Sequence, residues 1–165
     1  MNTLQSLFAQ KSWANNELFS ALEAVTSAEH AAEVRTAIRT LNHNYVADKI
    51  FLAHLTGEQH GYAATNTELT PELDELQFCV AETDAWFKSY TASISNAQLS
   101  ERIAFRFTDG DAGTMTREEM LMHVITHGAY HRGNVGQLLK SISVAPPRDL
   151  YTKFLHLSEP ARRQA

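Results

Sequence analysis

Apolar residues in this chain of 165 residues recur mostly three and four positions apart, the spacing that places them on one face of an α-helix. Four long stretches follow this pattern: residues 3–25, 31–55, a third that opens at Thr70-Pro71 and continues to about residue 94, and 117–141. Gly57 directly follows the second stretch, as glycine often follows a helix. Thr116 and Glu119 have the spacing of a capping box at the start of the fourth. The pattern therefore predicts four long helices.

Two segments depart from helical spacing. Ile103, Phe105 and Phe107 alternate with polar or small residues, which predicts one short strand, and Asp109-Gly110 after them is a turn signal. Residues 58–69 form a polar loop, and 150–157 a short amphipathic segment that we expect to cover part of the core. The sequence thus predicts a single all-α domain over residues 1–165. We expect an up-down-down-up four-helix bundle with a short strand or extended segment in the crossover before the fourth helix.

Composition excludes several classes of protein. With 44% hydrophobic and 20% charged residues, the chain has the balance of a globular domain. The longest apolar runs are too short for a transmembrane helix, and the N-terminus lacks the order of a signal peptide. A net charge of −5 argues against nucleic acid as a partner. The single cysteine, Cys79, suits a reducing compartment, so we expect a cytoplasmic protein with no membrane partner.

Three of the eight histidines, His123, His127 and His131, follow one another at intervals of four on the predicted fourth helix. Two imidazoles four residues apart are about 6 Å apart along the helix axis and can share one transition metal, whereas the outer two are about 12 Å apart. Measured from the centre of the apolar stripe, His131 lies at roughly 40°, His127 at roughly 80° and His123 at roughly 120°. We therefore expect His127 and His131 to face the bundle and His123 to lie nearest the solvent edge.

A further ligand must come from a facing helix, and the second helix offers His43, His54 and Asp48. His43 and His54 are too far apart to share one ion, and we interpret His54 as a surface residue at the helix end. His43 lies about 180° from the stripe that contains Leu41, yet its own face is also apolar. A helix that is buried on two sides can bring both His43 and Asp48 into contact with neighbours, so spacing alone leaves the third ligand open.

Three other polar side chains are candidates for supporting roles. Arg132 falls close to the apolar stripe, where it would either form a buried ion pair, with Asp48 or Asp149, or contact an anionic substrate. Asp48 and Glu119 are candidates for orienting imidazole N–H groups. Spacing does not decide between these alternatives.

Several segments resemble the DinB/YfiT-like superfamily of four-helix proteins: LFAQKSWANNELFSAL, LNHNYVADKIFLAHL, the FTDG turn and THGAYHRGNVGQLL. The most specific feature is an H-x3-HRG signature preceded by N-H-x4-D. The resemblance implies a three-histidine metal site and often a homodimer. Carried over by motif, the ligands are His43, His127 and His131. Members resembling this chain include S-transferases and isomerases that use low-molecular-weight thiols.

Three neutral imidazoles suit zinc, nickel, iron or copper, and suit magnesium or calcium poorly. We expect zinc or nickel first, with iron as an alternative. A site with three protein ligands and open positions is typical of catalysis, and its ion can favour a bound thiolate or hydroxide. Our leading hypothesis is a metal-dependent enzyme that transfers a low-molecular-weight thiol to a small-molecule electrophile. The alternatives are a metal-dependent hydrolase and a non-enzymatic, stress-induced module for metal binding or dimerisation.

Overall fold

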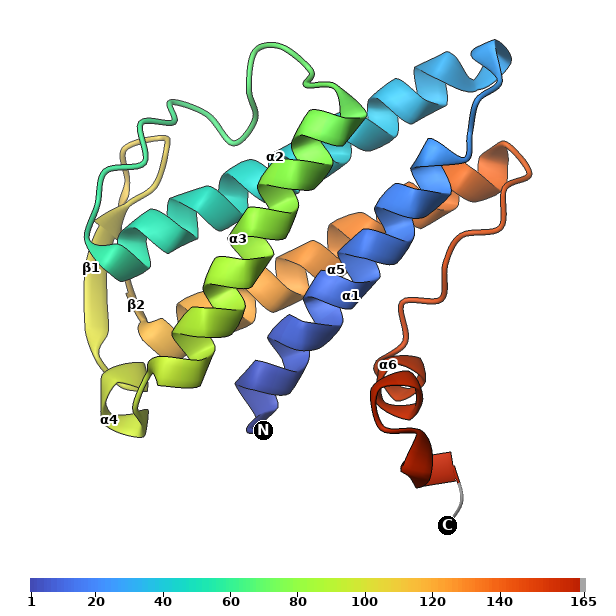
Figure 1. Cartoon of the computed structure of the whole chain (residues 1–165). Helices are drawn as coiled ribbons and strands as arrows, with labels where there is room; N and C mark the ends of the chain where they lie inside the picture. The colour runs from blue at the N-terminus through green and yellow to red at the C-terminus, as the bar shows by residue number, and fades with distance from the viewer. Residues whose placement is uncertain (164–165) are drawn as a thin grey trace.

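Four long helices form the body of the molecule. In the computed structural model, which describes residues 1–163, they are α1 (Thr3–Glu23), α2 (Ala31–Thr56), α3 (Leu73–Ser93) and α5 (Arg117–Ser141). Helices α1 and α2 each pack against both α3 and α5. In Figure 1, α1 and α5 run in one direction, and α2 and α3 run in the opposite one. The predicted, mostly helical fold is confirmed.

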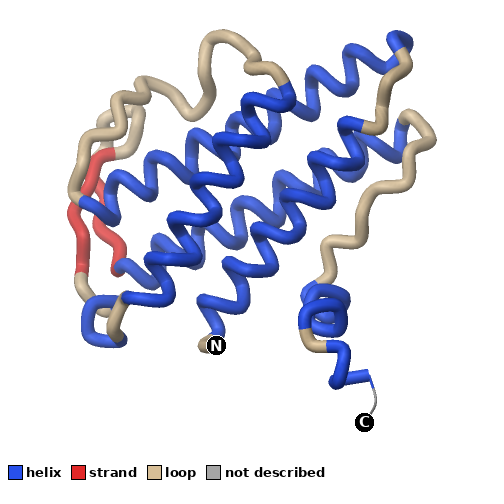
Figure 2. Tube along the Cα trace, in the orientation of Figure 1, coloured by secondary structure: helices blue, strands red, loops and turns tan. Residues whose placement is uncertain are grey.

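Shorter elements cover the ends of these helices. A two-stranded sheet at one end of the bundle is drawn in red in Figure 2, and α6 lies beside α1, which it contacts. None of the helices within residues 1–163 has both the length and the apolar character needed to cross a membrane. The short elements are η1 (Ala28–His30), α4 (Asn96–Leu99), β1 (Arg102–Arg106), β2 (Ala112–Thr116), α6 (Tyr151–Ser158) and η2 (Pro160–Arg163).

The predicted helix ends agree with the structure at two points and differ at a third. Thr116 and Glu119 form the expected capping box before α5, and Gly57 ends α2 with a left-handed φ of 78°. Helix α3, however, begins at Leu73 rather than at Thr70-Pro71. Two acidic residues in its first turn stabilise the positive end of the helix dipole, so no capping hydroxyl is required there.

The region predicted as one short strand is an antiparallel hairpin of β1 and β2. Phe105 on β1 is paired with Gly113 on β2. A Cβ atom at Gly113 would lie 2.7 Å from the ring of Phe105 and 2.9 Å from that of Phe107, so only glycine leaves room for both rings. Strand β2 therefore lacks the alternating large apolar residues by which strands are detected, and the sequence pattern missed it.

The interior consists of two apolar clusters. One lies toward the hairpin and includes Phe8, Phe51 and Phe87, while the other lies toward the opposite end and includes Leu18 and Leu139. Between them along the four helices is a set of buried polar residues that we call the polar layer: Lys11, Asn15, Asn44, Asp48, Asp84 and Arg132. Every long helix contributes to this layer, so its contacts fix how the helices align along the bundle.

Lys11 is the centre of the polar layer. Its ammonium group lies 2.8 Å from Asp48 Oδ2 on α2 and also forms an ion pair with Asp84 on α3, and all three side chains are almost completely buried. Asn15 donates to Asp84 Oδ2 at 2.8 Å and accepts a longer hydrogen bond from Arg132. Arg132 in turn forms an ion pair of 2.7 Å with Asp149, in the segment between α5 and α6. One connected network therefore joins all four helices to the C-terminal segment.

Burial and charge act in opposite directions within this network. Burial would lower the pKa of Lys11, but the charges of Asp48 and Asp84 outweigh it and raise that pKa above its usual value. For Asp48, burial outweighs the attraction of Lys11 and raises the pKa of the carboxyl to about 6. Lys11 thus remains charged. Ionisation of Asp48 is less favourable than in water, because the buried carboxylate has lost its hydration.

We predict that Lys11→Met lowers the free energy of unfolding by about 3–5 kcal/mol, because it leaves two buried carboxylates without their cation. The measurement is urea denaturation at pH 7. Lys88→Met, at an exposed lysine on α3, is the matched control and should change the value by no more than about 0.5 kcal/mol. Equal stability of the Lys11→Met variant and the wild type would contradict this account of the polar layer.

The raised pKa of Asp48 predicts a pH dependence of stability. Between the unfolded pKa of 3.8 and the folded pKa of about 6, the folded state binds more protons than the unfolded state. The contribution of Asp48 to stability is therefore present below this window and is lost as the pH rises through it. Denaturation of wild type and Asp48→Asn between pH 4 and 7 should show the wild type losing stability relative to the variant. A relative gain would disprove the predicted direction.

Candidate metal centre

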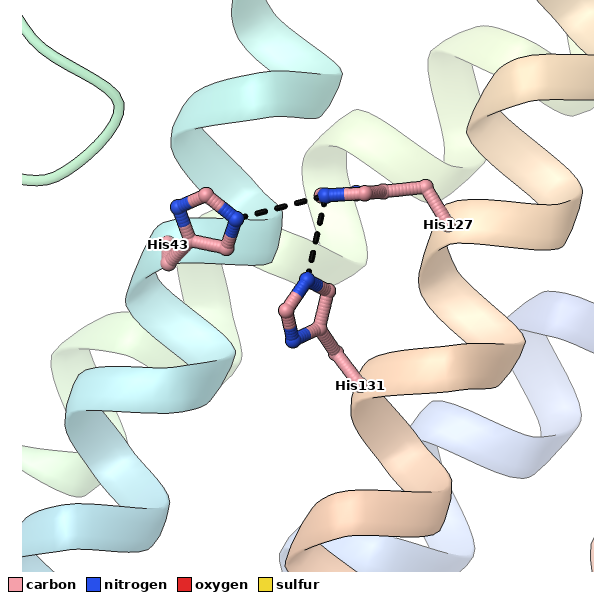
Figure 3. Close-up of side chains that lie close together, drawn as sticks. All are labelled: His43, His127 and His131. Atoms are coloured by element: carbon pink, nitrogen blue, oxygen red, sulfur yellow. Dashed lines mark hydrogen bonds between the residues drawn. The ribbon is translucent and has the colours of Figure 1, made fainter.

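Three histidines from two adjacent helices lie together at the level of the polar layer. His43 comes from α2, and His127 and His131 come from successive turns of α5 (Figure 3). Their ligating nitrogens all lie within 4.8 Å of one another, and the side chains are half-buried. The three residues could therefore hold one metal ion.

The imidazoles are oriented toward a common point. His127 Nε2 lies 3.2 Å from His43 Nε2 and 3.1 Å from His131 Nε2 (Figure 3). The rings of His43 and His131 also lie edge to face, with centroids 4.7 Å apart. In a tetrahedral site with metal–nitrogen bonds of about 2.0–2.1 Å, neighbouring ligand nitrogens are about 3.3 Å apart. The two nitrogen–nitrogen distances therefore fit such a site.

Hydrogen bonding decides which nitrogen of His43 is free to bind. Its Nδ1 lies 2.7 Å from the carbonyl oxygen of Thr65. Because a carbonyl only accepts, Nδ1 must carry the proton, and in the neutral ring Nε2 then presents its lone pair to the other two histidines. This is the arrangement in which metal-binding histidines are commonly held.

The loop that supplies this carbonyl is fastened to α2. Asn42 donates hydrogen bonds to the side chains of Asn66 and Thr67, and Asn66 donates to the carbonyl of Arg39 at 3.1 Å. The residue before His43 thus holds the loop whose carbonyl orients His43. The polar loop predicted at residues 58–69 has a positioning role that its composition did not reveal.

The protonation state of the histidines on α5 also favours metal binding. Burial, reinforced by His131, His123 and His43, lowers the pKa of His127 to about 4. The pKa of His131 is lowered by burial and then by the nearby His43. Both rings are consequently neutral at pH 7, which is the form that binds a metal. His131 Nδ1 is buried and has no hydrogen-bond partner among residues 1–163, unlike the second nitrogen of His43.

The two other histidines near the site lie where the sequence did not place them. His123 was expected at the solvent edge and His54 on the surface, but both are half-buried. His123 stacks on Phe51 at 4.5 Å, and His54 lies 4.8 Å from the ring of Phe105. Phe51 from α2 buries part of His123, and Phe105 from the hairpin buries part of His54. Contacts with other elements cannot be predicted from the residue spacing within a single helix.

The supporting residues suggested by the sequence make other contacts. Asp48 pairs with Lys11, and Glu119 caps α5 through Thr116, so neither of these contacts orients an imidazole. Arg132 forms an ion pair with Asp149, the second of the two partners considered. Its contact with a substrate remains a prediction.

Two hollows adjoin the triad. The first, of about 370 Å³, is open and polar, and its lining residues are Thr36, Arg39, Thr40, His43, Asn66, His131 and Asn134. The second, of about 200 Å³, is more enclosed and is lined by apolar and aromatic side chains together with His43 and His127. Sequence reasoning missed Arg39, although it precedes His43 by four residues and so lies on the same helix face.

The comparisons with known proteins agree with this architecture. A sequence model of the DinB family matches residues 1–163, which include every element described above. The chain belongs to the DinB family. It is also similar to Protein DinB of Bacillus subtilis (strain 168), with 24% identity over 161 residues that cover 93% of this chain and 94% of that protein. All three histidines of this DinB-family chain lie within the matched residues.

Proposed function

We propose that this DinB-family chain is a metal-dependent enzyme that transfers a low-molecular-weight thiol to a small electrophile, with His43, His127 and His131 as the metal ligands. The convergence of three Nε2 atoms at a half-buried point carries the proposal. When bound, a divalent transition metal such as zinc or nickel would lower the pKa of an adjacent thiol and favour the thiolate. Imidazoles bind a metal as neutral ligands, so they would leave the charge of such an ion undiminished.

The open polar hollow supports binding of the thiol. It adjoins His43 and His131, and it offers hydroxyl, amide and guanidinium groups. Arg39 is held at its rim by hydrogen bonds to the carbonyl of Thr67, at 2.8 Å, and to that of Glu68. A fixed guanidinium is suited to a carboxylate, so a thiol that carries a carboxylate fits this side of the site.

The reaction requires no further reactant. The S–H proton passes to water, an electron pair of sulfur forms the C–S bond, and the leaving group departs with the electrons of its former bond to carbon. The chain's part is to position both reactants and to exclude water from the electrophile. Hydrolysis is less well supported, because within residues 1–163 no aspartate or glutamate lines either hollow to act as a general base.

We predict that protein purified without added metal contains about one transition-metal ion per chain, because three imidazole ligands suffice to retain it. Elemental analysis should show at least a tenfold loss in each of His43→Ala, His127→Ala and His131→Ala. His123→Ala is the matched control, since this histidine has the same spacing on α5 but stacks on Phe51, and it should retain the metal. Equal metal content in all four variants would refute the ligand assignment.

A second prediction concerns the thiol. With 1-chloro-2,4-dinitrobenzene as electrophile, the metal-loaded protein should form thioethers from both L-cysteine and 2-mercaptoethanol. Arg39→Ala should raise KM about tenfold for L-cysteine, because the variant loses one charged contact with the carboxylate of this thiol. KM for 2-mercaptoethanol, which has no carboxylate, should change by no more than about twofold. Arg35→Ala, at an exposed arginine one turn earlier, is the control.

Two results would count against thiol transfer. Turnover that persists without any thiol would indicate hydrolysis of the electrophile instead. Turnover that is the same in wild type and in the three histidine variants would show that the triad does not take part.

A further inference from the structure

The less open of the two hollows, beside His127, has a composition that the proposed thiol site does not explain. It lies between α2, the hairpin and α5, and its walls are mainly rings and aliphatic side chains. The residues that line it, besides His43 and His127, are Ala47, Ile50, Phe51, His54, Thr65, Phe105, Phe107, Thr108 and His123. We call it the aromatic pocket.

The rings of the aromatic pocket form a continuous series that begins at the triad. His123 stacks on His127 with centroids 5.2 Å apart, and Phe51 stacks on His123 at 4.5 Å. Phe105 follows at 6.4 Å from Phe51, and Phe107 lies edge-on to Phe105 at 4.9 Å. Walls of this kind favour stacked and edge-to-face contacts with a flat ring.

Within residues 1–163, the lining of the aromatic pocket contains no acidic or strongly basic side chain. Among the described residues, no aspartate, glutamate, lysine or arginine contributes to its walls. A charged ligand would lose its hydration there and gain no counter-charge.

Size and access favour a small ligand. Apolar cavities of about 150 Å³ accommodate benzene, so a hollow of about 200 Å³ has room for one substituted ring. Phe107 packs edge-on against Phe105 and is nevertheless 48% exposed, so its ring lies between the pocket and solvent. Gly113 leaves the space that these two rings occupy, so β2 is adapted to their placement.

We infer that the aromatic pocket binds the electrophile, as a small, flat, uncharged aromatic group held against His127, and that the hairpin selects which groups enter. This inference rests on the proposed function for the identity of the ligand as the second substrate. The two hollows then separate the reactants by chemistry, with a polar thiol on the side of Arg39 and an aromatic electrophile on the side of Phe107.

Binding can be tested on metal-free protein, so that it does not depend on the metal site. Fluorobenzene, followed by fluorine NMR, should bind saturably, and 4-fluorobenzoate, its charged counterpart, should bind at least tenfold more weakly. Phe107→Ala should weaken fluorobenzene binding at least fivefold. Phe78→Ala, which removes a ring that is 65% exposed on α3, is the matched control and should leave it unchanged.

The location of the probe can be tested separately. If metal-free protein is loaded with Co²⁺, the fluorine signal of bound fluorobenzene should broaden, because the aromatic pocket adjoins the triad. Absence of saturable binding, equal binding of the two probes, or equal affinity of the Phe107→Ala and Phe78→Ala variants would overturn the inference. Those results leave the proposed function intact if the wild type retains metal and the histidine variants lose it. Conversely, saturable binding of fluorobenzene by a wild-type protein that retains no metal on purification would support the aromatic pocket and refute the metal site.

Discussion

The ion pairs of Lys11 with Asp48 and Asp84 set the alignment on which the rest of the bundle depends. Apolar clusters above and below tolerate small sliding motions of a helix, but a buried ammonium group between two carboxylates does not, because a displaced charge would remain unpaired. The network continues through Asn15 to Arg132 and so includes α5. His43 stands five residues before Asp48, and His131 stands next to Arg132. Alignment of the polar layer is therefore also alignment of the histidine triad.

The N-H-x4-D signature can be understood residue by residue in this light. Asn42 fastens the loop after α2, His43 receives its orientation from a carbonyl of that loop, and Asp48 anchors the same helix in the polar layer. Neighbouring residues of the HRG segment on α5 also have different roles. His131 belongs to the triad, and Arg132 binds the C-terminal segment through its ion pair with Asp149. Residues adjacent in sequence thus connect the candidate site to the parts of the fold that position it.

Much of the fold and two of the three candidate ligands follow from helical spacing. Apolar periodicity located α5, and the angle around its axis placed His127 and His131 on the inner side, because both properties belong to a single helix. The direction of His43 did not follow, since α2 is buried on two sides and its own pattern does not say which side faces α5. His54 and His123 were misplaced for the same physical reason. Phe51 and Phe105, which cover them, come from another helix and from a hairpin whose second strand carries no apolar alternation.

The proposed transfer of a polar thiol to an apolar electrophile would pose a problem of solvation, because the two reactants require opposite surroundings and yet must meet. A single hollow with one kind of lining would give the thiol and the electrophile the same surroundings. Here the hollows on the two sides of the triad differ because the hairpin borders only the second of them, whereas the loop after α2 reaches both, through Asn66 and Thr65. The loop after α2 borders the polar hollow through Asn66, and the hairpin borders the aromatic pocket through Phe105 and Phe107. His43 lines both hollows. In the proposed reaction the helices would position the triad, and the two connecting segments, which contribute no residue to the polar layer, would determine what reaches it.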